Sequence, residues 1–374
     1  MVTGNDGELT VLDLLRRVVE TGASDLHMKA GSSPVLRIRG GLVPQELPAL
    51  TVEAVQNAFS QIVTEEQRAA FDREKELDFA FSGDGIGRFR VNAALQRGSI
   101  TLAFRAVRSD IPTLEELGLP DICRSLVLKP RGLVLVTGPT GCGKSTTLAA
   151  MIDHLNERER RHIVTVEDPI EFFHQDKQCL ISQRELGADT TSFASALKHV
   201  LRQDPDVILV GEMRDLETIA LALTAAETGH LVLATLHTPS AAQTIDRVVD
   251  SFPPHQQQQI KVQLSTVLEA VLCQTLLPTA DSSGRVAAVE VMVATSAVRN
   301  LIREGKTFQI PNVIQTGSQY GMQTLDQALA VLHQRGVVTR DEAVARCTDP
   351  AELERLLAAG PARGPTLRHE RTHG

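Results

Sequence analysis

The stretch GLVLVTGPTGCGKSTTL, residues 132–148, joins a run of apolar residues to a glycine-rich loop and then to a helix-forming segment. Its loop fits the pattern G-x-x-x-x-G-K-[ST], with Lys144 and Ser145 at the last two positions. In this pattern backbone N–H groups and a helix N-terminus converge on one point, and both favour the binding of phosphate oxygens. The stretch therefore predicts a phosphate-binding loop between a buried strand and a helix.

A loop of this kind holds ATP in a defined way. We expect the backbone N–H groups of residues 141–146 to surround the β-phosphate, Lys144 to reach the β- and γ-phosphate oxygens, and Ser145 to hold Mg²⁺. The residues expected to bind the nucleotide are Thr140, Gly141, Cys142, Gly143, Lys144, Ser145 and Thr146. The alternative is an incidental glycine-rich turn, and the strand and helix patterns on its two sides disfavour it.

Strand-like and helix-like segments alternate in the chain after this loop. Three apolar runs, separated by segments of helical periodicity, are HIVTVED, DVILVGE and LVLATLH. This order predicts an α/β domain with a doubly wound, mostly parallel sheet. Because the carboxyl ends of parallel strands lie along one edge, side chains that follow each run should meet the phosphate-binding loop there. These side chains are Asp168 with Glu171, Glu212 and His237.

The acids and histidines at these ends are candidates for catalysis. Glu212 ends DVILVGE, where a carboxylate can polarise the attacking water, although Gly211 stands where many P-loop ATPases carry Asp. A solvated acid at a strand end is the alternative. His230 and His237 flank LVLATLH. A single histidine is more often structural than catalytic, but His237 gains weight from its place at the carboxyl edge.

The chain divides by composition into four segments. Residues 1–108 read as a small α+β domain, 109–290 as the α/β domain, 291–360 as a helical region and 361–374 as a disordered tail. A helix near 52–72 is expected in the first segment, and a short helix between Pro112 and Pro120 follows it.

Composition argues against several classes of protein. The net charge of −8 and the absence of Trp disfavour a nucleic-acid-binding surface. The five cysteines form no C-x-x-C pair, so neither a zinc element nor a disulfide framework is indicated. The first residues, MVTGNDGELTVLDLL, are acidic, and no apolar run approaches the ~20 residues that span a bilayer, so we expect neither a signal peptide nor direct membrane insertion.

Arginines recur on strand-like segments of the first domain: Arg88, Arg90, Arg97 and Arg105. Arginines that alternate with apolar residues form either a solvated face or an anion clamp. Without further context, the solvated face is the favoured reading.

Five blocks of sequence carry a resemblance to a known family: GPTGCGKSTTL, VEDPIEF, LRQDPDVILVGEMRD, ETGHLVLATLHTPSAAQTIDRVVDSFP and SAVRNLIREGK. In this order and spacing they resemble the secretion ATPase superfamily, and within it most closely the retraction ATPases of type IV pili. The likeness runs from SDLHM at 24–28 to about residue 355.

The resemblance implies a homohexameric ring of subunits, each with a PAS-like N-terminal domain and a RecA-like P-loop ATPase domain. It implies a cytoplasmic protein, peripheral to the inner membrane through a PilC-like platform protein. The roles it implies are a catalytic Glu212, an essential acid at Glu171, histidines of the His box at His230 and His237, and γ-phosphate contacts from Arg90 and Arg105. These roles reverse the solvated reading of the two arginines.

AVRNLIREG, residues 297–305, indicates where the energy of hydrolysis goes. Val298, Leu301 and Ile302 form an apolar stripe, while Arg299 and Arg303 are expected to share a basic side. A helix that only stabilises its domain is the alternative. In retraction ATPases the matching segment, AIRNLIRE, is associated with pilus disassembly; this chain differs from the family there by Val298, and in the phosphate-binding loop by Cys142.

Three rival functions stay open. Pilus extension and type II secretion ATPases usually carry a four-cysteine zinc element and a further N-terminal domain, which this sequence does not match. A nucleotide-binding ring scaffold with low turnover is disfavoured by the complete set of Lys144, Glu171 and Glu212. A nucleic-acid translocase is disfavoured by the acidic composition.

Overall fold

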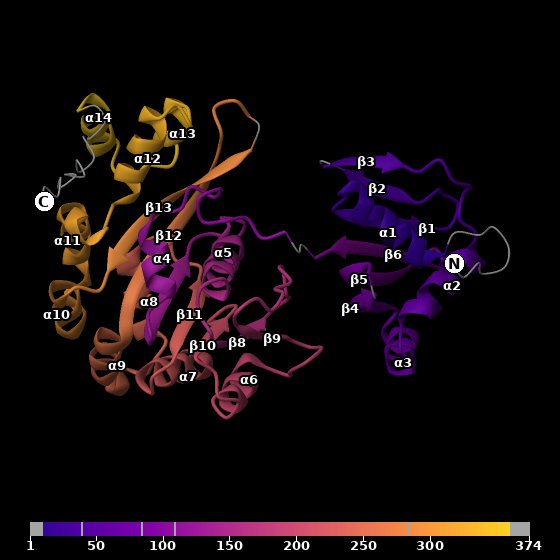
Figure 1. Ribbon diagram of the computed structural model, residues 1–374, viewed down its shortest axis with the longest axis horizontal. Helices are drawn as coiled ribbons and strands as arrows, with labels where there is room; N and C mark the ends of the chain where they lie inside the picture. Colours follow the sequence, from indigo (N-terminus) through magenta and orange to yellow (C-terminus); the bar gives the residue numbers. More distant parts are fainter. Residues whose placement is uncertain (1–9, 39, 84, 108–109, 283, 360–374) are drawn as a thin grey trace, which may run out of the picture. The chain divides into compact units, whose positions relative to one another are not determined.

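The computed structural model describes residues 10–359 apart from 39, 84, 108, 109 and 283 (Figure 1). The chain forms two compact units. The first comprises Met1–Asp110 together with Ile170–Phe173, and the second comprises Ile111–Pro169 and His174–Gly374. The tail expected at 361–374 lies outside the described residues.

The first unit contains a six-stranded antiparallel sheet in the order β3-β2-β1-β6-β5-β4. Its strands are β1 (Asp25–Lys29), β2 (Val35–Ile38), β3 (Gly41–Pro44), β4 (Glu76–Gly83), β5 (Gly87–Gln96) and β6 (Ser99–Ala106). Along β5, Phe89, Val91 and Ala93 are buried while Arg90 and Asn92 are exposed. This alternation gives the sheet one apolar face and one polar face.

Three helices supply the rest of this unit's core: α1 (Val11–Thr21), α2 (Val52–Ile62) and α3 (Glu65–Glu74). The single helix expected near 52–72 is wrong, because Val63 leaves the helical conformation and a second helix starts after it. Thr64 caps α3 by accepting from the Gln67 N–H, and the Gln67 side chain accepts from the Thr64 N–H. This reciprocal capping box marks a helix start that helical periodicity alone does not reveal.

The second unit is built on a seven-stranded sheet in the order β13-β12-β7-β11-β10-β8-β9. Its strands are β7 (Gly132–Thr137), β8 (His162–Glu167), β9 (Leu180–Glu185), β10 (Val207–Val210), β11 (Leu231–Leu236), β12 (Leu268–Pro278) and β13 (Arg285–Val293). All neighbouring pairs are parallel except β12 with β13. The predicted fold class is confirmed.

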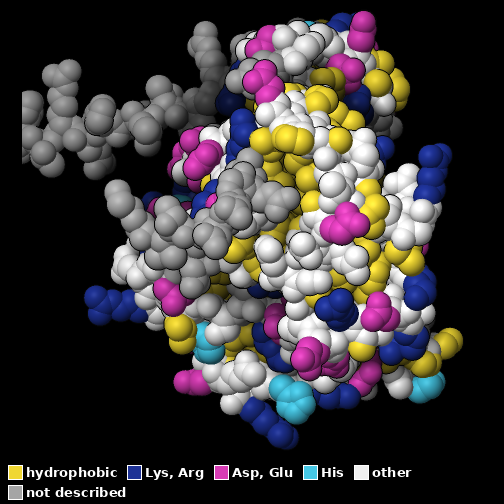
Figure 2. All heavy atoms as spheres, turned by 90° about the vertical axis from the view of Figure 1, so that its right-hand side faces the viewer, with side chains coloured by type: hydrophobic (Ala, Val, Ile, Leu, Met, Phe, Trp, Pro, Cys, Tyr) yellow, Lys and Arg dark blue, Asp and Glu magenta, His cyan; other side chains and the backbone are white. Residues whose placement is uncertain are grey.

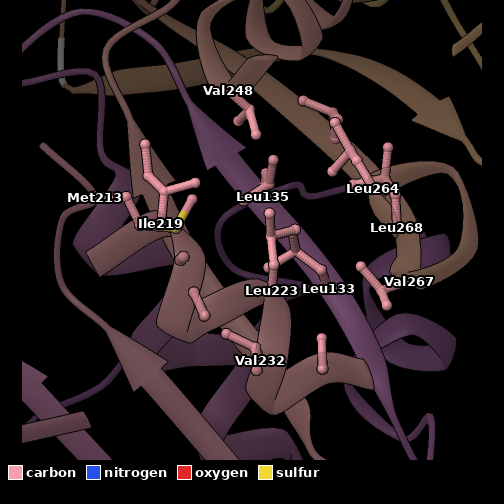
Figure 3. Close-up of a cluster of buried hydrophobic side chains, with 14 of the residues drawn as sticks. Leu133, Leu135, Met213, Ile219, Leu223, Val232, Val248, Leu264, Val267 and Leu268 are labelled. Atoms are coloured by element: carbon pink, nitrogen blue, oxygen red, sulfur yellow. The ribbon is translucent and has the colours of Figure 1, made fainter. Parts of the chain in front are cut away.

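Helices cover both faces of this sheet: α4 (Ile122–Val127), α5 (Lys144–Asn156), α6 (Phe193–Val200), α7 (Leu216–Glu227), α8 (Ala241–Asp250) and α9 (Pro254–Val267). Alternate residues of β7 enter different cores: Leu133 and Leu135 pack with α6 to α9, whereas Val134 and Val136 pack with α4 and α5. Figure 3 shows Leu133 and Leu135 among side chains that include Leu223 of α7. A strand buried on both sides reads as an unbroken apolar run, which is why GLVLVT lacks alternation.

The C-terminal region is helical, as expected, with α10 (Ser296–Glu304), η1 (Thr307–Gln309), α11 (Ile310–Thr316), η2 (Ser318–Tyr320), α12 (Leu325–Gln334), α13 (Arg340–Val344) and α14 (Pro350–Ala358). The basic side expected on α10 is only partly present, since Arg303 is exposed but Arg299 is not. The guanidinium of Arg299 donates to the carbonyls of Ala294, Ser265 and Thr266 and to Glu269. Arg299 therefore ties α10 to the end of α9 and the start of β12.

The helix expected between Pro112 and Pro120 does not form. Thr113 and Glu116 exchange the hydrogen bonds of a capping box, but the segment forms only a turn, in which Gly118 has a φ of 63°. The regular helix, α4, begins after Pro120. The capping residues are present, but no segment with helical spacing of apolar residues follows them, so only an isolated turn forms.

The surface carries both signs of charge. On the face in Figure 2, Lys and Arg side chains are intermixed with Asp and Glu side chains. Within the described part of the chain, no helix is both long and apolar enough to cross a membrane.

Candidate nucleotide-binding site

The loop between β7 and α5 contains glycines in backbone conformations that residues with a side chain rarely adopt. At Gly138 the φ is 133°, and a Cβ would lie 2.3 Å from the carbonyl oxygen of Gln274 and 2.7 Å from Sγ of Cys142. Gly143, with a φ of 92°, is the N-cap of α5, and it provides no side-chain cap. The first N–H groups of α5 therefore lack the side-chain acceptor that usually satisfies them. This geometry fits a phosphate group.

Lys144 lies across this loop. Its side chain is buried, and Nζ donates to the carbonyl oxygens of Gly138 at 2.9 Å and Pro139 at 3.2 Å. Nζ also lies 3.4 Å from Nδ1 of His237. Charged phosphate oxygens are stronger acceptors for an ammonium than neutral carbonyls are. Lys144 is thus already placed where bound phosphates would compete for it.

Glu212 follows β10 and is held from two sides. Nε and Nη2 of Arg214 lie 2.7 Å from the two carboxylate oxygens, and Nε2 of His237 lies 2.9 Å from Oε1. The bidentate bond from Arg214 is the main cause that lowers the pKa of Glu212; partial burial opposes it, and His237 adds to the lowering. Lys144, His237, Glu212 and Arg214 therefore form one continuous chain of polar contacts.

The glycine before Glu212 has a steric explanation. A Cβ on Gly211 would lie 3.1 Å from both Glu167 Cα and the carbonyl oxygen of Val166. Its N–H donates to that same carbonyl at 2.7 Å. A side chain such as Asp would therefore press on the backbone of β8, which would have to give by a few tenths of an ångström, and the carboxylate that follows β10 is that of Glu212.

The two histidines lie at opposite ends of β11. His237 directly follows Leu236 at the carboxyl edge, whereas His230 precedes Leu231 at the other edge. Six strand residues span roughly 20 Å. The His230 ring instead bonds the carbonyl oxygen of Ala225 through Nδ1 at 2.9 Å. Within this chain His230 does not join Lys144 and Glu212, and its catalytic role stays a prediction.

The remaining candidates belong to the first unit. Arg90 and Arg105 are exposed and directly opposite each other on β5 and β6. Two like charges in such a pair repel unless an anion accompanies them. Asp25 on β1 bonds Nε of Arg105 at 2.8 Å and lies 3.7 Å from Nε of Arg37. Glu171 is exposed and groups with this unit. The roles of Arg90, Arg105 and Glu171 stay predictions.

Two contacts near the loop were missed by sequence reasoning. Arg214 is part of the motif GEMRD, and its position two residues after Glu212 is the sequence signal that could have identified it as a partner of that carboxylate. Gln274 was missed because residues 268–278 were not recognised as a strand. Its amide donates to the Thr147 hydroxyl at 2.9 Å and so ties α5 to β12.

Comparison with known proteins places these features in a family. The family model described as "Type II/IV secretion system protein" matches residues 8–344. The chain is 51% identical over 335 residues to the type IV pilus retraction ATPase PilT of Pseudomonas aeruginosa, covering 90% of this chain and 97% of that one. It is 49% identical over 345 residues to a twitching motility protein of Neisseria gonorrhoeae, covering 92% of each.

A solved structure agrees. The crystal structure of the pilus retraction motor PilT with bound ADP superimposes with a TM-score of 0.86 at 46% identity, covering 93% of this chain and all of that one. The geometry of the phosphate-binding loop, the contacts around Glu212 and these likenesses lead to the same conclusion. This chain belongs to the type II/IV secretion system protein family of ATPases.

Proposed function

We propose that this chain is the ATPase motor that powers type IV pilus retraction. The observation that carries this proposal is 51% identity to PilT over 97% of that protein's length, together with a closely similar PilT structure. The motor works as a homohexameric ring on the cytoplasmic side of the inner membrane and passes its motion to a PilC-like platform protein. The domain limits 1–108, 109–290 and 291–360 are part of the same proposal.

ATP is the substrate in this proposal. The backbone N–H groups of residues 141–146 bind the phosphate chain, and Lys144 exchanges the carbonyls of Gly138 and Pro139 for phosphate oxygens. The hydroxyl of Ser145, in the first turn of α5, would hold Mg²⁺, which neutralises phosphate charge when bound. Thr140, Cys142 and Thr146 complete the lining of the loop.

Glu212 is the proposed base that orients and polarises the attacking water. The contacts from Arg214 and His237 keep it ionised, which a general base requires before it can accept a proton. His237 touches both Glu212 and Lys144, so it can couple the binding of phosphate to the position of the base. Arg90 and Arg105 are proposed to add positive charge at the γ-phosphate, with Glu171 as a further acid and His230 as a second histidine.

Deletion of the gene tests the proposed direction of work. Electron microscopy and a twitching assay are applied to the deletion strain and to the strain complemented with the wild-type gene. We expect surplus surface pili and no twitching in the deletion strain, both reversed by complementation. Loss of pili would instead assign the chain to pilus extension, and unchanged pili with unchanged twitching would remove it from pilus dynamics.

A further inference from the structure

A row of paired residues, three of which carry a hydroxyl, thiol or carboxyl group, crosses the second unit's sheet beside the nucleotide-binding loop. Leu236 of β11 pairs with Thr137 of β7, Thr137 pairs with Cys273 of β12, and Cys273 pairs with Glu290 of β13. Thr137 is the last residue before the loop, and Leu236 is the last residue before His237. The row therefore joins the two strand ends that carry Lys144 and His237 to the outer strand β13.

The row is held by a side-chain hydrogen bond between β7 and β12 and by backbone pairing between β12 and β13. The hydroxyl of Thr137 donates to Sγ of Cys273 at 3.0 Å, and Cys273 lies directly opposite Glu290 in the pairing of β12 with β13. Both Thr137 and Cys273 are fully enclosed in the core, at 0% and 3% exposure. Buried polar groups nearly always have a hydrogen-bond partner, so we take the pairing of these side chains as a defined feature of the fold.

Glu290 ends the row on a helix. Its Oε1 accepts the N–H of Ala241, the first residue of α8, at 2.7 Å. This N–H is one of the four that a helix leaves unpaired at its start, and a carboxylate there is also favoured by the helix dipole. Ser240, the N-cap, satisfies a different N–H, that of Gln243. Glu290 thus fixes the point at which the chain re-enters regular structure after β11.

Only four residues, 237–240, separate the end of β11 from this fixed point. The first of them is His237, which contacts Glu212 and Lys144. A second bond, between the hydroxyls of Thr238 and Thr244 at 2.7 Å, holds the middle of the segment to α8. With both ends anchored, the segment has little freedom to move the imidazole away from Glu212.

We propose that Glu290 is a positioning residue of the ATPase site: by accepting the Ala241 N–H it fixes the start of α8 and holds His237 against Glu212. This inference rests on the proposed ATPase function. The hydrogen bond that Glu290 accepts comes from Ala241 and not from the loop of residues 138–146, so we expect its loss to lower turnover more than nucleotide affinity. Burial raises its pKa, and the Asp326 charge adds to this effect, whereas the bonds from Ala241 and Cys273 oppose it.

The test compares Glu290→Gln with Glu290→Ala in the full-length protein. Gln keeps a carbonyl oxygen for the Ala241 N–H, while Ala removes the acceptor. We expect Ala to lower kcat for ATP about tenfold with KM within about twofold, and Gln to restore kcat to within about threefold of wild type. Glu354→Ala, which removes a surface ion pair with Arg340, is the matched control and should leave both constants unchanged.

A double-mutant cycle tests whether Glu290→Ala lowers kcat through His237. If Glu290 acts through His237, Glu290→Ala should cause no further loss of kcat in a His237→Ala background. Ala241→Pro offers a second way to remove the same bond, because proline lacks the N–H and is tolerated at the first helical position. It should reproduce the loss of kcat if Glu290→Ala does not fold.

Three results would overturn the inference: wild-type kcat in folded Glu290→Ala or Ala241→Pro, equal losses in the Gln and Ala variants, or full additivity with His237→Ala. Wild-type protein that hydrolyses no ATP would be a failure of the proposed function itself, and it is measured first.

Discussion

Nε2 of His237 lies 2.9 Å from Oε1 of Glu212, and the other nitrogen of the same ring lies 3.4 Å from Nζ of Lys144. One imidazole therefore contacts both the proposed base and the lysine that is proposed to bind phosphate. Because Lys144 also bonds the carbonyls of its own loop, phosphate binding must change its contacts. We therefore infer that a change in the contacts of Lys144 on ATP binding is transmitted to Glu212 through His237.

Glu212→Gln should separate binding from hydrolysis. The amide keeps the shape of the side chain but cannot accept a proton, so ATP should still bind while turnover falls about 100-fold or more. A malachite-green phosphate assay and equilibrium binding of a fluorescent ATP analogue measure the two properties. Wild-type turnover in this variant would remove Glu212 from its role.

Lys144→Ala should weaken nucleotide binding. The substitution removes the positive charge that is expected on the β- and γ-phosphate oxygens, so we expect at least a tenfold rise in the Kd for ATP, roughly the value of one charged hydrogen bond. Lys129→Ala, which removes a partly exposed amine paired with Glu269, is the control. An unchanged Kd in Lys144→Ala would mean that the loop binds phosphate without its lysine.

Arg214→Ala should move the pH dependence of hydrolysis. The bidentate bond from Arg214 is the main cause that lowers the pKa of Glu212, so its removal raises that pKa. A base must be ionised to act, and the acid limb of kcat/KM should therefore shift to higher pH in the variant. Steady-state rates from pH 8 down to below pH 4.5, the ordinary pKa of a glutamate, measure the shift. An acid limb at the wild-type pH would show that Arg214 does not tune Glu212.

His174→Gln should flatten the dependence of stability on pH. Burial lowers the pKa of His174 to about 4, and its Nδ1 is buried without a hydrogen-bond partner among the described residues. The unfolded chain takes up a proton below about pH 6.5 whereas the folded chain does not, so stability falls as the pH drops from there toward 4. The loss at pH 5 is about 2 kcal/mol.

The measurement for His174 is the melting temperature at pH 7 and pH 5. Wild type should lose more than His174→Gln between these two values. His255→Gln, at an exposed site near the start of α9, should behave like wild type. Identical pH dependence in His174→Gln and wild type would mean that the imidazole is protonated in the folded state.

Arg299→Ala should destabilise the second unit. Its guanidinium bonds three carbonyl oxygens and Glu269, and removing it leaves these acceptors without their partner. We expect a loss of about 1–3 kcal/mol in thermal or urea unfolding. Arg303→Ala, on the exposed side of the same helix, should cost less than about 0.5 kcal/mol. Equal losses would show that both arginines are structurally equivalent.

Part of the site could be predicted from the sequence because the carboxyl ends of parallel strands lie along one edge of the sheet. Glu212 and His237 lie 25 residues apart in the chain, yet each follows a parallel strand, and their contact at 2.9 Å follows from that placement. The same rule gave weight to His237 alone, and His230 was kept as a catalytic candidate because the family motif groups the two histidines. His230 precedes the strand, and its position at the opposite edge was therefore open to prediction.

Other features depend on packing that no local pattern reveals. Residues 268–278 are mostly apolar but are interrupted by Glu269, Gln274 and Thr275, and such a segment does not distinguish a buried strand from a buried helix. Without β12 and β13, neither Gln274 nor Glu290 could be connected to the site. Arg299 and Arg303 have equivalent helical spacing, and only the position of α9 beside α10 makes one of them structural.

Shortening of individual fluorescently labelled pili on living cells tests the central claim most directly. It is followed in the deletion strain complemented with the wild-type gene or with Glu212→Gln. We expect pili to shorten with wild type and to stay extended with Glu212→Gln at the same level of protein. Shortening at the wild-type rate with Glu212→Gln would contradict the account, because retraction would then proceed without hydrolysis at this site.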